Sequence, residues 1–415
     1  MNTSTTYKKT ELDSGIRIVS ETIPYVRSVS IGVWINVGSR DEKSEVNGIS
    51  HFVEHMVFKG TKKYNNKQIA KSIEEYGGYL NAFTSKENTC YYGKVLDEHV
   101  EKTVDVLSEL VLNPTLNPKD IEKEKTVVLE ELKNIEDDPE DYIHDYLDKT
   151  MFGKHPLGYS VIGEAKNIRS FTKNQLLKYI RNYYSPGRIV ISAAGNISHE
   201  KLVDLVKSRF ENNKRKNNNH LERSFKPVKA YRKIIEEAKP IQQSHICMGT
   251  VTGGIKSKNR YPLVVMNTLL GGGMSSRLFQ TIREKYGYAY SVSSFLNMLS
   301  DCGCLGVYAG TSKKNIQKTI ELINNELKKL RILALNKTEL NRTKAQVKGS
   351  MMLSLESMSS RMMRLASGEI YFNEYTTLDS IVKRIDAVTI DDILEVANKY
   401  LYPENFSVVI FKPSE

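Results

Sequence analysis

The chain has 415 residues and a mass of 47.2 kDa, which corresponds to two to four domains at about 100 to 200 residues each. Hydrophobic residues make up 40% and charged residues 26%, values that exclude a disordered or fibrous protein. The net charge of +11 would suit nucleic acid, but much of the excess lies in residues 207–233, an asparagine-rich run typical of a linker. We therefore expect no nucleic-acid partner.

The sequence also lacks signals for membrane insertion or export. No run approaches the roughly 18 to 20 apolar residues that a spanning helix needs, so we expect no membrane span. The first 20 residues are polar, without the apolar core of a secretory signal. With residue 1 as the true start, these features predict a cytoplasmic protein.

The first predicted elements are a strand and a short helix. Apolar residues at every second position from 29 to 37 predict a half-buried strand over residues 28–37. The following ISHFVEHMVF, residues 49–58, contains His51, Glu54 and His55. On a helix, the two histidines differ by 40° in azimuth, so both imidazoles project from one face and can bind one zinc ion. Glu54 stands beside them, where a general base for water is needed. Shuffled sequences of this composition would contain H-x-x-E-H in only about 1% of cases.

A second helix offers a further zinc ligand, because catalytic zinc usually has three protein ligands and a water. The segment 118–139 predicts this helix, with Asn117 as its N-cap, Pro118 at its first position and Pro139 beyond its end. It carries Glu124, Glu130 and Glu131, and the step of seven residues places the first and last at nearly the same azimuth. A carboxylate on a buried side needs a partner, which a cation would supply. The residues that indicate the buried side are Val127, Val128 and Leu132.

The second half of the chain repeats the first. Residues 75–110 align with residues 285–327, and each half has strands followed by helices, which predicts the α+β class with two homologous domains. Residues 189–193 and 406–410 are predicted to be the closing strands of the two copies. No H-x-x-E-H occurs after residue 55. The predicted domains are an N-terminal catalytic zinc-binding domain, 1–212, a basic linker, 213–228, and a C-terminal homologous domain without metal, 229–415.

The motif and its spacing resemble a known family. H-x-x-E-H marks the inverzincins, and GISHFVEHMVFKGT, residues 48–61, followed by EKTVVLEEL, residues 124–132, resembles the pitrilysin family, which includes insulin-degrading enzyme and mitochondrial processing peptidase. The length is similar to that of two-domain bacterial members. The resemblance implies a clamshell of two domains around a chamber and a zinc-dependent endopeptidase that cleaves short or unfolded peptides. It also implies that His51, His55 and Glu131 bind Zn²⁺ and that Glu124 supports these ligands.

Further residues take roles from the same resemblance. Asn81 and Ala82, within residues 77–92, match the strand edge where the substrate backbone pairs. Residues 269–292 present Arg283 and Tyr290, which match a pair that reaches the substrate and the tetrahedral intermediate. We therefore expect Glu54 as general base, assisted by Arg283 and Tyr290.

The sequence does not decide between several partners and substrate preferences. Family members of this length usually pair, so a homodimer or a pair with a sister subunit is expected. Leader-peptide processing is one possible activity, and the main alternative is a catalytically silent core or regulatory subunit of a larger complex. Residues 136–148 form an acidic cluster that would favour basic substrates, or equally a solvated helix face.

Overall fold

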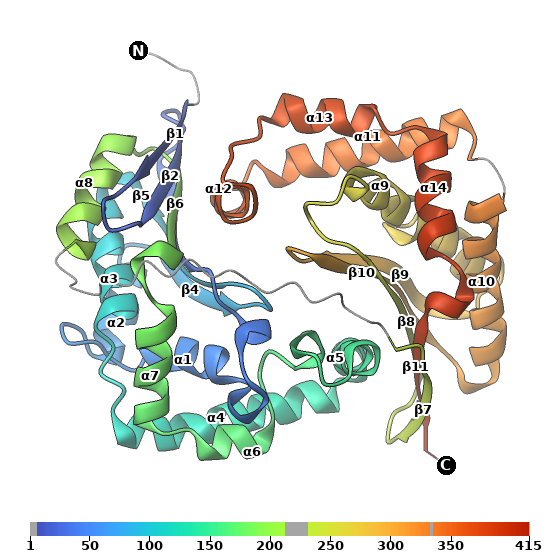
Figure 1. The fold of residues 1–415 in the computed structure, drawn as a ribbon, viewed down its shortest axis with the longest axis horizontal. Helices are drawn as coiled ribbons and strands as arrows, with labels where there is room; N and C mark the ends of the chain where they lie inside the picture. The colour runs from blue at the N-terminus through green and yellow to red at the C-terminus, as the bar shows by residue number, and fades with distance from the viewer. Residues whose placement is uncertain (1–5, 212–230, 333–334, 415) are drawn as a thin grey trace. The chain divides into compact units, whose positions relative to one another are not determined.

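The computed structural model describes residues 6–211, 231–332 and 335–414 (Figure 1). The described chain forms two compact units. The first unit comprises residues 6–132, 159–211 and 354–375, and the second takes the remaining described residues. The predicted basic linker, 213–228, lies outside the described residues.

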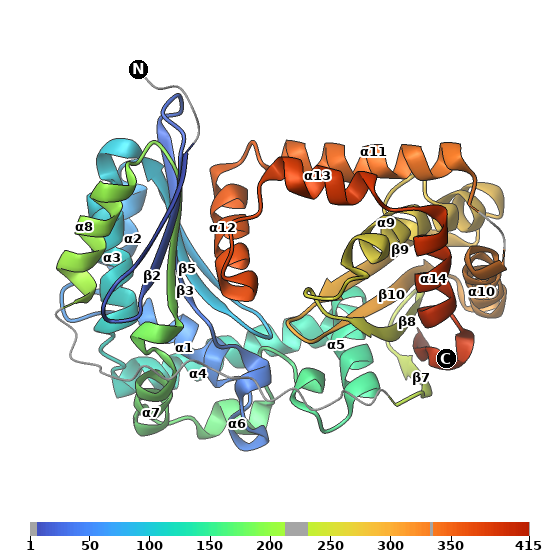
Figure 2. The same ribbon diagram turned by 45° about the horizontal axis from the view of Figure 1, so that its top comes forward.

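The first unit contains a six-stranded sheet with the order β1-β2-β6-β3-β5-β4. Strands β2 and β6 are parallel, and all other neighbours are antiparallel. Helices α3 and α8 pack on one face of this sheet, and α12 packs on the other (Figures 1 and 2). The strands are β1 (Thr6–Glu11), β2 (Arg17–Thr22), β3 (Ser28–Ile35), β4 (Tyr79–Thr84), β5 (Thr89–Leu96) and β6 (Ile189–Gly195). The helices are α1 (Ile49–Val57), α2 (Asn66–Glu74), α3 (Val100–Leu112), α4 (Pro118–Asp137), which continues into the second unit, α6 (Ala165–Ser170), α7 (Lys173–Tyr183), α8 (His199–Phe210) and α12 (Met358–Phe372).

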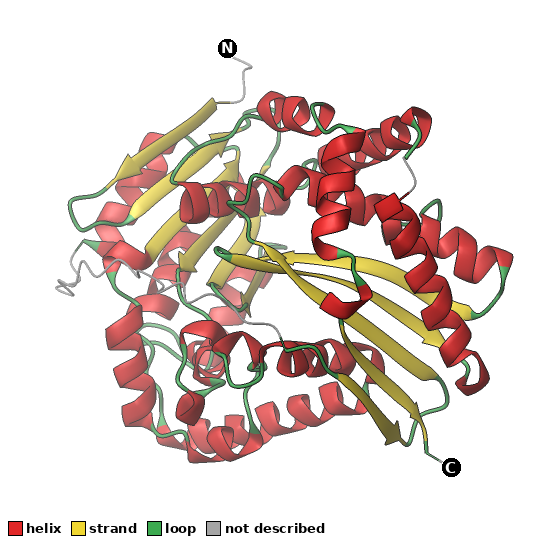
Figure 3. Cartoon of the chain, turned by 45° about the vertical axis from the view of Figure 1, so that its right-hand side comes forward, coloured by secondary structure: helices red, strands yellow, loops and turns green. Residues whose placement is uncertain are grey.

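The second unit contains a five-stranded sheet with the order β7-β11-β8-β10-β9. Strands β7 and β11 are parallel, and the other pairs are antiparallel. Helix α5 packs on β8 and β11, and α9, α10 and α14 pack around the same sheet. The strands of both sheets are yellow in Figure 3. The strands are β7 (Ile234–Lys239), β8 (Ser244–Gly253), β9 (Ala289–Met298), β10 (Cys302–Thr311) and β11 (Ser407–Pro413). The helices are α5 (Pro139–Phe152), α9 (Arg260–Gly271), the π-helix η6 (Phe279–Lys285), α10 (Ile316–Ile332), α11 (Lys337–Ser354), α13 (Leu378–Asp386) and α14 (Ile390–Tyr400).

The two sheets confirm the predicted repeat and the α+β class. Five strands of the first sheet, in the order β2-β6-β3-β5-β4, correspond to β7-β11-β8-β10-β9 of the second, and in both the first pair is parallel. The predicted closing strands are β6 and β11. None of the helices in the described residues is long and apolar enough to cross a membrane.

The predicted half-buried strand at residues 28–37 is wrong in one respect, because β3 is buried on both faces. Helix α12 covers the second face: Ser30 Oγ lies 3.0 Å from Ser359 Oγ, and Trp34 belongs to an apolar cluster with Met362. The alternation of apolar residues along a strand shows that one face is buried, but it does not show what packs on the other face. The covering helix, α12, lies more than 300 residues downstream, so the local sequence of β3 does not predict it.

The predicted helix at 118–139 is α4, and Asn117 Oδ1 accepts a hydrogen bond from the Lys119 N–H at 2.9 Å, as an N-cap does. Its buried side was expected to include Val127, which is instead 50% exposed. Val127 lies 100° around the helix axis from the fully buried Val128, on the side that faces solvent. The residues that are buried in this helix are Ile121, Glu124 and Val128.

The compact units do not follow the two sequence halves strictly. Helix α5 belongs to the first half of the sequence but packs on the sheet of the second unit, where Ile143, Leu147 and Met151 enter its core. Helix α12 belongs to the second half but packs on the sheet of the first unit. The two sheets thus exchange their covering helices.

Candidate metal centre

Helix α1 presents the H-x-x-E-H residues on its less buried face. Its apolar side chains are buried in the first unit, while His51, Glu54 and His55 are partly exposed. The imidazole rings of His51 and His55 lie 4.5 Å apart between centroids. The predicted helical spacing therefore brings the two rings together on one face.

Helix α4 brings a carboxylate to the two imidazoles. Glu131 Oε1 lies 3.6 Å from His51 Nε2, and Glu131 Oε2 lies 3.4 Å from His55 Nε2. One ligand atom from each of these three residues lies within 4.8 Å of the others. Of the three glutamates that the sequence offered, Glu131 is the one that reaches both histidines.

The donor set suits a divalent cation. Two imidazole nitrogens and one carboxylate oxygen are typical ligands of catalytic zinc, which keeps a fourth position for water. Glu131 Oε2 is buried and has no hydrogen-bond partner among the described residues. The nearby imidazoles of His51 and His55 lower the pKa of Glu131, so its carboxyl group is ionised at neutral pH. A cation between the three side chains would satisfy that oxygen.

Glu124 orients His55 from behind. The Glu124 side chain is 3% exposed, and its oxygens lie 2.8 Å from His55 Nδ1 and 2.6 Å from Lys59 Nζ. Burial would raise the pKa of Glu124, but the hydrogen bonds from His55 and Lys59 lower it overall. Because an ionised carboxylate can only accept, His55 carries its proton on Nδ1 and leaves Nε2 for a ligand bond. Burial lowers the pKa of His55, but Glu124 and Glu131 outweigh this effect and raise it.

Glu54 lies beside the three predicted ligands, and its carboxylate contacts β4. Thr84 Oγ1 donates a hydrogen bond to Glu54 Oε2 at 2.6 Å. Burial raises the pKa of Glu54, although Thr84 and the two histidines oppose this effect. A carboxylate with a raised pKa accepts a proton more readily, which suits a general base.

Strand β4 carries the residues predicted to touch the substrate. It forms the outer edge of the sheet and pairs only with β5 among the described strands. Asn81 is exposed and Ala82 is partly exposed, and Asn81 Oδ1 accepts a hydrogen bond from the Ala82 N–H at 2.8 Å. The strand also packs on α1.

Arg283 and Tyr290 belong to the second unit. Arg283 lies on η6 with its guanidinium 4.8 Å from the Phe279 ring centre, and Tyr290, on β9, is 66% exposed. Their role toward the substrate stays a prediction. Within the described residues, His51, His55 and Glu131 are the one group found that could hold a metal ion, so the second copy shows no equivalent.

Two residues of the centre were not predicted: Thr84, which contacts Glu54, and Lys59, which contacts Glu124. Thr84 could have been found from strand periodicity, because it lies two residues after Ala82 and faces the same side of β4. Lys59 lies two residues after the end of α1, and no pattern in the sequence indicates that its ammonium group contacts Glu124 on α4.

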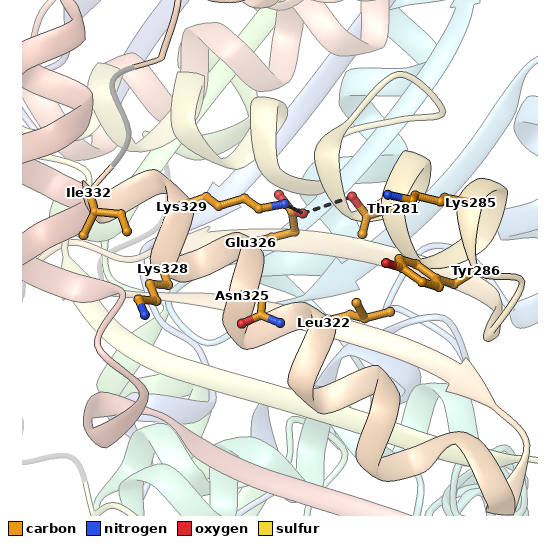
Figure 4. Close-up of a pocket in the computed structure, with 9 residues that line it drawn as sticks. All are labelled: Thr281, Lys285, Tyr286, Leu322, Asn325, Glu326, Lys328, Lys329 and Ile332. Atoms are coloured by element: carbon orange, nitrogen blue, oxygen red, sulfur yellow. Dashed lines mark hydrogen bonds and ion pairs between the residues drawn. The ribbon is translucent and has the colours of Figure 1, made fainter.

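A cavity of about 330 Å³ in the second unit contains none of the predicted site residues. It lies between η6 and α10, as Figure 4 shows, and its buried carboxylate, Glu326, is bound by Thr281 Oγ1 at 3.0 Å and Lys329 Nζ at 2.7 Å. No histidine or cysteine lines it. This cavity therefore lacks the chemistry of the site on α1 and α4.

The family follows from comparison with known proteins. Residues 17–165 match the family model described as insulinase (peptidase family M16), and residues 170–347 match the model of the peptidase M16 inactive domain. A Bacillus subtilis protein named uncharacterized zinc protease YmxG is 42% identical over 98% of both chains. A Streptomyces coelicolor protein, also named an uncharacterized zinc protease, is 37% identical over 95% of this chain and 87% of its own. The chain belongs to the M16 family of peptidases.

Solved structures show the same fold. A crystal structure of a protease from Helicobacter pylori has a TM-score of 0.89 and 23% identity, covering 99% of this chain and 100% of that one. A structure of a peptidase M16 inactive domain from Pseudomonas fluorescens has a TM-score of 0.92 and 19% identity, covering 99% and 98%. The family models and the relatives confirm the predicted family, and these structures show that the fold is shared.

Proposed function

We propose that the protein is a zinc-dependent endopeptidase that hydrolyses short or unfolded peptides. The observation that carries this proposal is the convergence of His51, His55 and Glu131, with Glu54 beside them and outside the ligand set. The two relatives named above are called zinc proteases, which supports the choice of metal.

His51 Nε2, His55 Nε2 and Glu131 would hold the ion. A zinc ion bound there supplies a Lewis acid that makes water nucleophilic near neutral pH. Glu54 takes one proton from the attacking water while the water oxygen bonds to the scissile carbonyl carbon. Glu54 then gives that proton to the leaving nitrogen, so the C–N bond breaks and a carboxylic acid and an amine are released. Thr84 holds the second oxygen of Glu54 during both transfers.

The substrate binds in extended form along β4. A peptide added to an edge strand gains main-chain hydrogen bonds that do not depend on its sequence, and Asn81 and Ala82 contact it there. Arg283 and Tyr290 donate to the oxyanion of the tetrahedral intermediate. The π-helical turn that carries Arg283 is consistent with this role, because such turns often occur at functional sites.

The acidic segment at 136–148 favours basic residues in the substrate. Asp138 caps α5 by accepting the Glu140 N–H at 2.9 Å, which already gives it a structural role. Glu136, Asp137 and Asp141 are exposed and remain open to a ligand. Replacing these three with their amides should reduce the ratio of kcat/KM between arginine-containing and arginine-free peptides. An unchanged ratio would leave the segment as a solvated helix face.

The decisive experiment compares wild type with Glu54→Gln. The wild-type protein should bind one zinc ion and cleave an unstructured peptide, and a chelator should stop cleavage. Glu54→Gln should retain zinc but lose hydrolysis, because the amide cannot accept the proton. A metal-replete wild-type protein that leaves every flexible peptide intact would instead favour the silent-subunit alternative. Size measurement of the purified protein would test the predicted homodimer.

A further inference from the structure

A buried carboxylate lies at the start of α1, and the proposed reaction does not use it. Glu42 is 5% exposed and accepts four hydrogen bonds from Asn47 and Gly48, just before that helix, and from Ser50 in its first turn. Asn47 Nδ2 and the Gly48 N–H donate to Oε2 at 2.9 and 2.7 Å. The N–H and the hydroxyl of Ser50 donate to Oε1 at 2.8 and 2.5 Å. These donors occupy the four lone-pair positions that an ionised carboxylate offers.

The local backbone is built to aim these donors inward. Gly48 has φ of 97°, and a Cβ atom there would lie 2.5 Å from the carbonyl oxygen of Ile162, so only glycine fits. Ser50 Oγ is 2.6 Å from the hydroxyl of Tyr179 on α7. Because Ser50 gives its only hydroxyl proton to Glu42, Tyr179 must donate to Ser50. A negative charge at a helix N-terminus is also favoured by the helix dipole.

The loop that carries Glu42 is attached at its other end to the turn after β4. The Ser39 N–H donates to the carbonyl of Ser85 at 3.1 Å. Arg40 Nη1 lies 2.5 Å from Glu87 Oε1, and both side chains are nearly fully buried. The loop at residues 39–48 therefore links the start of α1 to the hairpin whose first strand is the predicted substrate edge.

We propose that Glu42 is a positioning residue for the metal centre. By fixing the first turn of α1 to this loop, it holds the imidazoles of His51 and His55 at the distance from Glu131 that one ion requires. The proposal rests on the proposed function, because it assumes that these three residues bind zinc. Groups that hydrogen-bond to the metal ligands themselves typically contribute about 10- to 100-fold in metal affinity, and Glu42, which binds the neighbouring Ser50, is expected at the lower end of this range.

The test replaces Glu42 with glutamine. Glutamine keeps the shape, but in either orientation its NH₂ group faces two N–H or O–H donors, so the first turn of α1 must shift. The zinc dissociation constant, measured by chelator competition, should rise about 10-fold. The visible absorption bands of the Co²⁺-loaded protein should change, since they report ligand geometry, and kcat should fall while KM stays constant.

Two further variants make the result specific. Glu45→Gln removes an exposed carboxylate of the same loop and should leave metal affinity and the Co²⁺ spectrum unchanged. Tyr179→Phe removes one hydroxyl from the network and should weaken zinc binding by a smaller factor. If Glu42→Gln does not fold, unchanged zinc affinity of Tyr179→Phe would contradict the inference. A folded Glu42→Gln protein with wild-type zinc affinity and spectrum would overturn the inference. Absence of zinc binding by the wild type would instead overturn the proposed function, and the inference with it.

Discussion

His55 depends on Glu124 for its orientation, and this contact can be tested separately from the ligands. Glu124→Gln keeps an acceptor for Nδ1 but removes the charge that faces His55 and Lys59. We expect zinc affinity to fall about 10- to 100-fold, measured by chelator competition, with hydrolysis restored at high zinc concentration.

The control for this prediction lies on the same helix. Glu122→Gln changes a carboxylate that is 70% exposed and paired with Lys125, so zinc affinity should not change. Equal affinities of the Glu124→Gln and wild-type proteins would contradict the role given to Glu124.

Glu42 also predicts a pH dependence of stability. Burial raises the pKa of Glu42 to about 7, although its hydrogen bonds to Ser50, Gly48 and Asn47 lower it. The folded state therefore binds a proton more tightly than the unfolded state, whose carboxyl group titrates near 4.5. The free energy of unfolding should fall as pH rises from about 4.5 to about 7, by up to about 3 kcal/mol.

Chemical denaturation across this pH range, with wild type and Glu42→Gln in parallel, measures the effect. The difference in free energy of unfolding between wild type and Glu42→Gln should fall as pH rises, because glutamine does not titrate. Tyr179 does not contribute, since burial raises its pKa well above 10. Parallel pH profiles for the two proteins would show that Glu42 stays ionised throughout.

Single residues of the centre differ in how far the sequence reveals them. His51, Glu54 and His55 could be predicted because one helical turn places them together. The choice of Glu131 as the third ligand needed the family resemblance. Glu124 and Glu131 lie at nearly the same azimuth on the helix, so helical geometry alone does not choose between them. The contacts of Glu42 and Lys59 join separate segments, so local periodicity cannot show them.

Helix α12 is the element that seals the first sheet, and its packing can be measured. Met362 is fully buried against Trp34 and Val190, so Met362→Ala should leave a cavity and cost about 2 to 5 kcal/mol. Trp34 is the single tryptophan of the chain, so its fluorescence follows unfolding of this unit alone. Met352→Ala, at a side chain that is 39% exposed, serves as the control with a small expected change.

Element boundaries were largely predictable, but the exchange of helices was not. Helices α1 and α4 and strands β6 and β11 match their predicted ranges within a few residues, because periodicity, N-caps and prolines act locally. The burial of both faces of β3 and the position of α5 follow from long-range packing. A sheet-covering helix has the same apolar pattern whichever sheet it covers.

At the scale of the whole molecule, the exchange of α5 and α12 predicts that the sequence halves depend on each other. A fragment of residues 1–212 would lack α12 and expose Trp34, while the apolar side of its own α5 would lack β8 and β11. We expect fragments 1–212 and 229–415 to aggregate or bind a hydrophobic dye when made alone, and to yield a folded complex when co-expressed. Cooperative unfolding of fragment 1–212 with shielded Trp34 would contradict this.

The late position of α12 in the chain has a consequence for biosynthesis. The last strand of the first sheet ends at Gly195, but the helix that covers it is complete only at Phe372. At ribosomal rates of about 5 to 20 residues per second, one apolar face of the nascent sheet remains uncovered for roughly 10 to 35 s. Chaperone binding to ribosome-attached chains should therefore peak in that interval and decline once α12 emerges.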